Sequence, residues 1–165
     1  MRPEDHETRP TAEQVTLEPP ACVLRHVSKT SRAVIAAFDP AFAPIGLTGH
    51  QYNLMTTLNN NGELSVGALA GALGMDASGI PRAIRPLVSQ GLLQVERGSD
   101  RRQRVLSLTD AGRQRIAEAT DVWREVQTEL MDTIGAERWI TLIDDLRDIR
   151  NAAMACSTRA PRQSS

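Results

Sequence analysis

The chain has 165 residues, of which 41% are hydrophobic and 24% are charged, and its 19 basic and 20 acidic side chains nearly cancel. This composition is typical of one folded domain with tails and excludes a wholly disordered chain, and the net charge by itself indicates no partner. The two cysteines, Cys22 and Cys156, lie far apart in the sequence, which excludes a disulfide scaffold and a cysteine-based zinc site.

The two ends of the chain have the composition of flexible tails. Residues 1–20 hold four prolines among mostly polar residues, and residues 157–165 are polar as well. The N-terminus lacks the apolar segment of a signal peptide, and no apolar run reaches the ~18 residues of a membrane-spanning helix. We therefore expect a cytoplasmic protein with no membrane partner.

Between the tails, apolar residues at helical spacing predict a first helix over residues 21–38. Asp39-Pro40 should end this helix, because the residue before a proline avoids the α region. A capping box formed by Thr48 and Gln51 predicts the start of a second helix. That helix should stop at the run Asn59-Asn60-Asn61-Gly62.

Two further helices are predicted on either side of a tight turn at Gly74-Met75. The third helix should occupy residues 65–73, with the serine at its start as the cap. The fourth should run from a cap at Asp76 or Ser78 to Gln90, where a following glycine provides a stop signal.

The pattern then changes to that of strands. Residues 92–97 and 102–108 flank a turn-forming segment at 98–101, so we expect a β-hairpin with charge at its tip. Thr109-Asp110 should cap a long fifth helix, which Gly135 separates from a sixth helix. The expected core positions of the fifth helix are Ile116, Ala119, Trp123, Val126 and Leu130, and the sixth helix should carry an apolar stripe formed by Trp139, Leu142, Ile143, Leu146 and Ile149.

Charge is segregated along the chain although the total is nearly zero. The segment from Arg82 to Arg115 contains eight arginines and three acidic residues, a net charge of +5. Residues 116–150 contain nine acidic residues and four arginines, a net charge of −5. Because the guanidinium group suits bidentate contacts with phosphates and guanine edges, the basic segment indicates nucleic-acid binding. The alternative is a basic surface patch that pairs with the acidic helix of a neighbour.

A short helix, a glycine turn, a second helix and an arginine-tipped hairpin form the layout of a winged helix-turn-helix. In this arrangement one helix fits the major groove, and the hairpin reaches the adjacent backbone or the minor groove. The fourth helix should carry the aliphatic residues Ile80, Ile84, Leu87 and Val88 on one face, opposite its polar residues. The alternative for its arginines is ordinary solvation. The expected DNA contacts are Ser78, Arg82, Arg85 and Ser89 on the fourth helix and Arg97, Arg101, Arg102 and Arg104 on the hairpin.

Five short motifs, in this order and spacing, resemble the MarR family of bacterial transcriptional regulators over about residues 21–152. They are Gly46-Leu47-Thr48-x-x-Gln51-Tyr52, Leu69-Ala70-x-x-Leu73, Gly91-Leu92-Leu93, Asp100-Arg101-Arg102 and Leu108-Thr109-x-x-Gly112-Arg113. The resemblance implies a mainly α fold with a small β-hairpin wing, and N- and C-terminal helices that pair two copies. It also implies that Asp100 orients the wing while Arg101 and Arg102 contact DNA. Many family members release DNA on binding a small aromatic or phenolic ligand.

The start of the fourth helix departs from the family pattern. Family members commonly open this helix with Asp-Arg-Ser/Thr-Thr-x-Thr-Arg, whereas residues 76–82 read Asp-Ala-Ser-Gly-Ile-Pro-Arg. An arginine and two threonines are absent, so fewer side chains can reach bases and the target sequence cannot be predicted. Pro81 suits a first helical turn, whereas Pro86 removes a hydrogen bond further along, where we expect a kink.

We expect a homodimeric DNA-binding repressor that recognises a pseudo-palindromic operator and is released by a small organic ligand. Pairing with a second copy would bury the apolar stripe of the sixth helix and place two recognition helices ~34 Å apart. The alternatives are a monomer that folds these helices back, a winged-helix module that binds a protein, and a regulator that senses oxidants through Cys22. The predicted parts are a tail at 1–20, a dimerisation helix and linker at 21–46, the winged helix-turn-helix at 47–110, dimerisation helices at 111–156 and a tail at 157–165.

Signal input has fewer candidates. Cys22 is at the start of the first helix, where the N–H groups of the helix favour a thiolate, although a small apolar residue is the simpler interpretation. The three histidines lack a paired spacing for a metal, and no motif of an enzyme or cofactor site is present, so we expect no catalysis, cofactor or metal. The candidates for a ligand site, which could equally be ordinary surface residues, are Arg25, His26, His50, Gln51, Tyr52 and Trp123.

Overall fold

The computed structural model describes residues 22–98 and 103–157 and confirms the expected fold class, a mainly helical chain with a small β-sheet. Strand order in the antiparallel sheet is β1-β3-β2. Within the described ranges, none of the helices has both the length and the apolar character needed to cross a membrane. The elements are α1 (Val23–Phe42), α2 (Gly49–Asn61), β1 (Leu64–Ser65), α3 (Val66–Leu73), α4 (Ile80–Ser89), β2 (Leu93–Arg97), β3 (Arg104–Leu108), α5 (Asp110–Ile134) and α6 (Ala136–Ser157).

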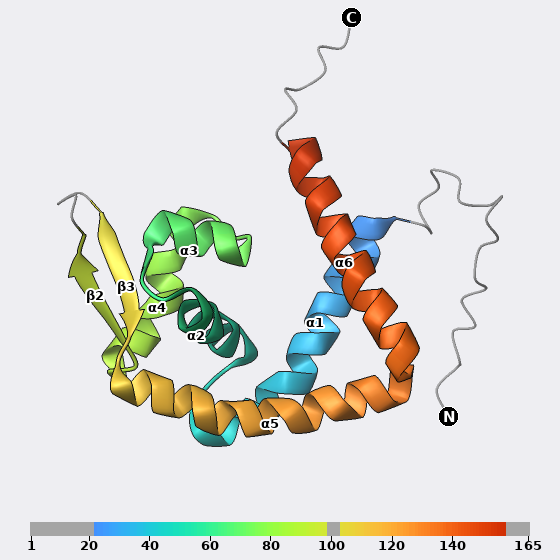
Figure 1. Cartoon of the computed structure of the whole chain (residues 1–165), viewed down its shortest axis with the longest axis horizontal. Coiled ribbons are helices and arrows are strands. Elements are labelled where there is room, and N and C mark those ends of the chain that lie inside the picture. The colour runs from blue at the N-terminus through green and yellow to red at the C-terminus, as the bar shows by residue number, and fades with distance from the viewer. Residues whose placement is uncertain (1–21, 99–102, 158–165) are drawn as a thin grey trace, which may run out of the picture.

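Helix α5 is the base on which the rest of the chain is arranged (Figure 1). A lobe that contains α2, α3, α4 and the sheet lies at its N-terminal end, whereas α1 and α6 lie towards its C-terminal end. The chain turns between α5 and α6 at Gly135, which has a positive φ of 89° and ends α5 as expected. α6 includes Ser157, so the helix extends one residue into the segment expected to be a tail.

The predicted end of the first helix is wrong. α1 continues through Pro40 to Phe42 instead of stopping at Asp39. Pro40 lies in the last turn, so its missing N–H removes one helical hydrogen bond. Continuing the helix places Phe42 in the core with an exposed fraction of 1%, where its ring stacks against Tyr52. Burial of that ring offsets the lost bond.

The start of α2 is confirmed as a capping box. The backbone N–H of Gln51 donates to the Thr48 hydroxyl, and the N–H of Thr48 donates to the Gln51 side chain at 2.9 Å. The carboxylate of Asp39 accepts the N–H of Gly49 at 2.7 Å, which ties the end of α1 to the first turn of α2. The helix then runs through all three asparagines and ends at Asn61, with Gly62 as its C-cap.

The start of the fourth helix differs in detail from the prediction. Asp76 is the cap, but residues Ala77–Gly79 form a 3-10 turn and the α-helix begins only at Ile80. It ends at Ser89, so Gln90 lies just outside, and it continues across Pro86. The short third helix is confirmed, with the Ser65 hydroxyl accepting the N–H of Ala68.

The hairpin is confirmed, with strands slightly shorter than expected. Its register pairs Leu93 with Leu108 at the base and Arg97 with Arg104 at the outer end. The connecting residues 99–102 lie outside the described ranges. The third strand, β1, has only two residues and pairs with β3, and the sequence pattern did not indicate it.

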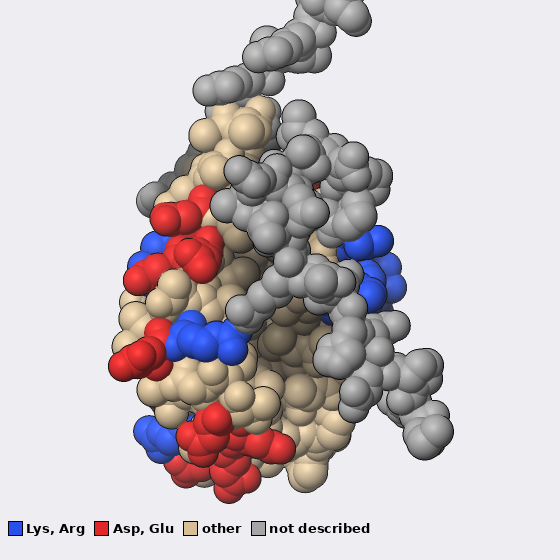
Figure 2. All heavy atoms as spheres, turned by 90° about the vertical axis from the view of Figure 1, so that its right-hand side faces the viewer, with Lys and Arg blue, Asp and Glu red and all other residues tan. Residues whose placement is uncertain are grey.

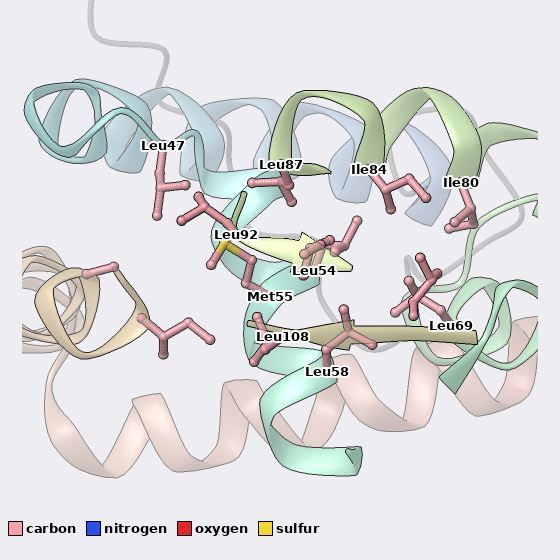
Figure 3. Packing of buried hydrophobic residues seen from close by; sticks show 14 of the residues in the cluster. Leu47, Leu54, Met55, Leu58, Leu69, Ile80, Ile84, Leu87, Leu92 and Leu108 are labelled. Carbon is pink, nitrogen blue, oxygen red and sulfur yellow. The ribbon is translucent and has the colours of Figure 1, made fainter. Parts of the chain in front are cut away.

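The core lies where α4, α2 and the sheet meet (Figure 3). Ile80, Ile84 and Leu87 point from α4 towards Leu54 and Met55 of α2. From α5, the expected core residues Ile116 and Ala119 are buried, and the next three expected positions are partly buried against the same cluster. The hydrophobic face of α4 is therefore occupied, and its other face is left for a partner.

The first turn of α5 packs directly on the junction between α4 and β2. The Thr109 hydroxyl donates to the carbonyl of Gly91 at 2.7 Å and accepts the N–H of Gly112, while the N–H of Thr109 donates to the carbonyl of Leu92. A Cβ on Gly112 would lie 2.1 Å from that carbonyl oxygen and 3.1 Å from Leu108. Only glycine lets the helix approach the backbone this closely.

We predict that Gly112→Ala lowers the free energy of unfolding by about 1–3 kcal/mol. The added methyl group would clash with backbone atoms of Leu92, which cannot rotate away as a flexible side chain can. Gly71→Ala is the matched control, since its Cβ meets nothing within 4 Å in the interior of α3. That control should stabilise by roughly 0.5–1 kcal/mol through helix propensity. Urea unfolding at one protein concentration measures both, and a Gly112→Ala protein as stable as the parent would contradict the packing described.

Candidate nucleic-acid interface

The outward face of α4 presents two arginines to solvent. Arg82 and Arg85 are exposed, while Ile80, Ile84 and Leu87 on the opposite side are buried. This is the amphipathic arrangement that anchors a helix on a core and leaves its polar face for a groove. Val88, expected on the aliphatic face, lies at the edge of that face, where its side chain is 38% exposed.

A carboxylate fixes the start of this helix. Asp76 accepts the backbone N–H of Ser78 at 2.8 Å and the hydroxyl of Ser78 at 2.6 Å. The hydrogen bond from the hydroxyl and then that from the N–H hold the pKa of Asp76 below its ordinary value. Ser78, an expected DNA contact, therefore lies at the exposed helix start with its hydroxyl hydrogen already engaged.

The wing brings two arginines face to face. Arg97 and Arg104 are directly opposite each other in the β2–β3 register, and both are exposed. Like charges in this position repel, so the pair is unfavourable unless an anion lies between or beside the two groups. Three expected contacts, Asp100, Arg101 and Arg102, lie outside the described residues.

The remaining arginines of the basic segment have structural roles. Arg113 donates to the carbonyl of Leu108 at 2.9 Å and pairs with Asp110. Arg115 donates to the carbonyl of Ile45 and pairs with Glu118. In contrast, within the described ranges no acidic side chain forms an ion pair with the α4 and wing arginines Arg82, Arg85, Arg97 and Arg104.

Acidic residues gather at the other end of the molecule. Figure 2 shows the face formed by α6 and the end of α5, with acidic groups along one side and below and an uncharged, hollowed area between. Several of these acids pair with arginines of their own helix, such as Asp121 with Arg124 and Asp144 with Arg147, each at 2.6 Å. The acidic groups of this face are therefore interspersed with basic ones.

The structure does not collect the six candidate ligand residues into one described hollow. One hollow of about 810 Å³ lies along α5 between Arg124 and Thr133, and another of about 350 Å³ lies between the end of α2 and the sheet, and neither is lined by a candidate. Gln51 is engaged in the capping box, and Tyr52 stacks on Phe42 with ring centroids 4.8 Å apart. Trp123 is partly buried against the core, and the exposed candidates are Arg25, His26 and His50.

The two cysteines are exposed at the far ends of two helices. Cys22 is the N-cap of α1, and its carbonyl accepts the N–H of His26, one turn from its own position. Cys156 lies near the end of α6. No cluster of three or more potential metal ligands occurs in the part of the chain that the structure describes.

Comparison with known proteins gives consistent matches. The model of the MarR family matches residues 45–103, which run from just before α2 to the wing. The uncharacterised HTH-type transcriptional regulator YdgJ of Bacillus subtilis is 29% identical over 107 residues, which are 64% of this chain and 65% of that protein. This chain therefore spans somewhat less than two thirds of the length of that relative.

Two solved structures resemble the whole fold. The M. tuberculosis transcriptional regulator MosR, in complex with DNA, has a TM-score of 0.75 at 27% identity, covering 82% of this chain and 98% of that one. The transcriptional repressor CouR, bound to a 23-mer DNA duplex, has a TM-score of 0.73 at 25% identity, covering 78% and 92%. The winged helix-turn-helix geometry and these matches together show that the chain resembles the regulators of the MarR family.

Proposed function

We propose that this protein is a DNA-binding transcriptional regulator that uses α4 and the wing as its DNA interface. The observation that carries the proposal is the set of exposed arginines on these two elements, with no acidic partner among the described residues. α4 has the width and polarity for a major groove, and the wing continues the basic surface beside it. The DNA complexes of MosR and CouR, which share this fold, support the same use.

The wing arginines fit phosphate better than any group of the chain that faces them. Arg97 and Arg104 repel each other in the uncomplexed protein, and a phosphate oxygen relieves that repulsion while it accepts their hydrogen bonds. Such contacts set affinity and register without reading sequence. Asp100, Arg101 and Arg102 at the tip are proposed to extend this contact.

We also propose that two copies act together through α1 and α6. Both helices carry large apolar side chains that the described residues leave exposed, among them Leu24 at 73% and Ile140 at 66%. Exposed apolar side chains of this kind mark an interaction surface. A symmetric dimer would present two α4 helices to successive major grooves of a pseudo-palindromic operator.

Repression and release by a small organic ligand complete the proposal. A dimer that occupies a promoter excludes other proteins from it, which favours repression. The Asp39 carboxylate couples α1 to the first turn of α2, where His50 is exposed and Tyr52 begins the core stack. A ligand that binds beside His50 would alter this connection between the dimer helices and the DNA lobe, whereas Arg25 and His26 lie about 20 Å away, near the other end of α1.

The DNA interface is tested by titrating promoter fragments from the protein's own locus at salt concentrations of about 50–200 mM. Over this range, binding that depends on several phosphate contacts weakens strongly. We expect the logarithm of affinity to fall linearly and steeply with the logarithm of salt. Arg82→Ala and Arg85→Ala should each weaken the best fragment by about tenfold or more and reduce discrimination against other sequences. Arg124→Ala, an exposed arginine on α5, is the control and should change neither quantity. Salt-insensitive binding, or equal effects of all three variants, would count against the proposal.

The wing is tested by Arg104→Gln, which should lower the affinity for DNA and raise the stability of the uncomplexed protein. Binding should weaken about equally for all sequences, and the salt slope should decrease by about 1. The uncomplexed protein should become more stable by about 0.2–1 kcal/mol, because the repulsion with Arg97 is removed. A variant that loses both affinity and stability would indicate a structural role instead.

The dimer is tested by Leu146→Glu, which places a charge on the exposed apolar stripe of α6. We expect sedimentation to show a shift from dimer to monomer and the specific duplex affinity to fall with it. Thr141→Glu adds the same charge to an exposed position on the opposite side of α6 and should leave the dimer intact. A parent protein that sediments as a monomer would overturn this part of the proposal.

A further inference from the structure

The outward face of α4 has a composition that restricts which bases it can recognise. At 3.6 residues per turn, Arg82, Arg85 and Ser89 lie along its centre. Pro81 and Val88 are seven residues apart and therefore lie on the same edge of that face, about two turns from each other, and both are exposed. We call these two side chains the apolar edge.

Hydrogen-bond donors on this face are limited to the arginines. The Ser78 hydroxyl donates to Asp76 at 2.6 Å, and the Ser89 hydroxyl donates to the carbonyl of Pro86 at 2.8 Å. Both serines have thus committed their hydrogens inside the protein. The guanidinium groups of Arg82 and Arg85 are the side-chain donors of α4 that remain for a base.

Each base presents a different edge in the major groove. Guanine offers two acceptors that match arginine, adenine matches the amide of Asn or Gln, and cytosine offers a donor that matches Asp or Glu. The helix Ile80–Ser89 contains none of these four residue types. Thymine differs from the others because its 5-methyl group is recognised by apolar contact, for which the apolar edge is suited.

We propose that Arg82 and Arg85 bind guanines and that Pro81 and Val88 contact the 5-methyl groups of thymines in the same half-site. This inference rests on the proposed DNA-binding function and adds the base chemistry to it. The exposure of Val88 then has a role, since an isopropyl group left in water by the protein alone becomes buried against the methyl groups of the duplex.

The test begins with the full-length protein and a library of randomised duplexes, from which bound sequences are selected. In the enriched duplex, each thymine is replaced by deoxyuridine and each guanine by 7-deazaguanine, one symmetric pair at a time. Loss of a contacted methyl should weaken binding about fourfold, the effect of one buried CH₂-sized group. Loss of a contacted guanine N7 should weaken it about tenfold.

Two variants assign the methyl effect to the apolar edge. At the contacted positions, the parent protein should bind the thymine duplex more tightly than the deoxyuridine duplex. Pro81→Ser and Val88→Ser should each lose this preference at one or more of those symmetric positions. Val95→Ser is the control, because Val95 has nearly the same exposure, 36%, but lies on the wing, and its thymine preference should be that of the parent. Circular dichroism and thermal unfolding verify that the variants are folded.

The outcomes separate the inference from the function on which it depends. A selection that enriches no duplex overturns the proposed function and the inference together. An enriched duplex that binds equally well after every thymine replacement overturns the inference alone. A methyl effect that persists unchanged in both Pro81→Ser and Val88→Ser also overturns it, whereas its loss in either variant and not in Val95→Ser supports it.

Discussion

The arrangement of this protein depends on the close approach of the first turn of α5 to the backbone of Leu92. Gly112 has no side chain to hold the two segments apart, and Thr109 bonds to both sides of the junction through its hydroxyl and its N–H. The end of α4, the start of β2, the end of β3 and the start of α5 thereby meet at one point. The outward face of α4 and the wing are oriented relative to each other by this junction.

Arginine serves two purposes in the same stretch of chain, and the structure separates them. Arg113 and Arg115 satisfy carbonyl groups and acidic neighbours, so they hold α5 against β3 and against the α1–α2 connection. The arginines of α4 and the wing lack such partners among the described residues, and one wing pair is placed in mutual repulsion. Their charge is thus available to a polyanion, while Asp110 and Glu118 of α5 are engaged with Arg113 and Arg115.

Local chemistry was predictable from the sequence, whereas distant packing was not. The caps at Thr48, Ser65 and Thr109 were confirmed because a cap depends on residues three positions apart. The end of α1 was wrong because burial of Phe42 outweighs the local effect of Pro40. The exposure of Val88 and the two-residue strand β1 also depend on neighbours distant in sequence. The contacts expected at the wing tip and the ligand residues stay predictions.

The continuity of α5 has a mechanical consequence. Its 25 residues form one uninterrupted rod of about 37 Å, with the wing junction at one end and α6 at the other. A rotation of only about 5° at the α6 end would sweep the far end through roughly 3 Å, since displacement grows with the length of the rod. A displacement of that size exceeds the tolerance of a hydrogen bond. A small rearrangement where α1 and α6 meet α5 would thus be amplified at the basic surface without any change in the junction itself.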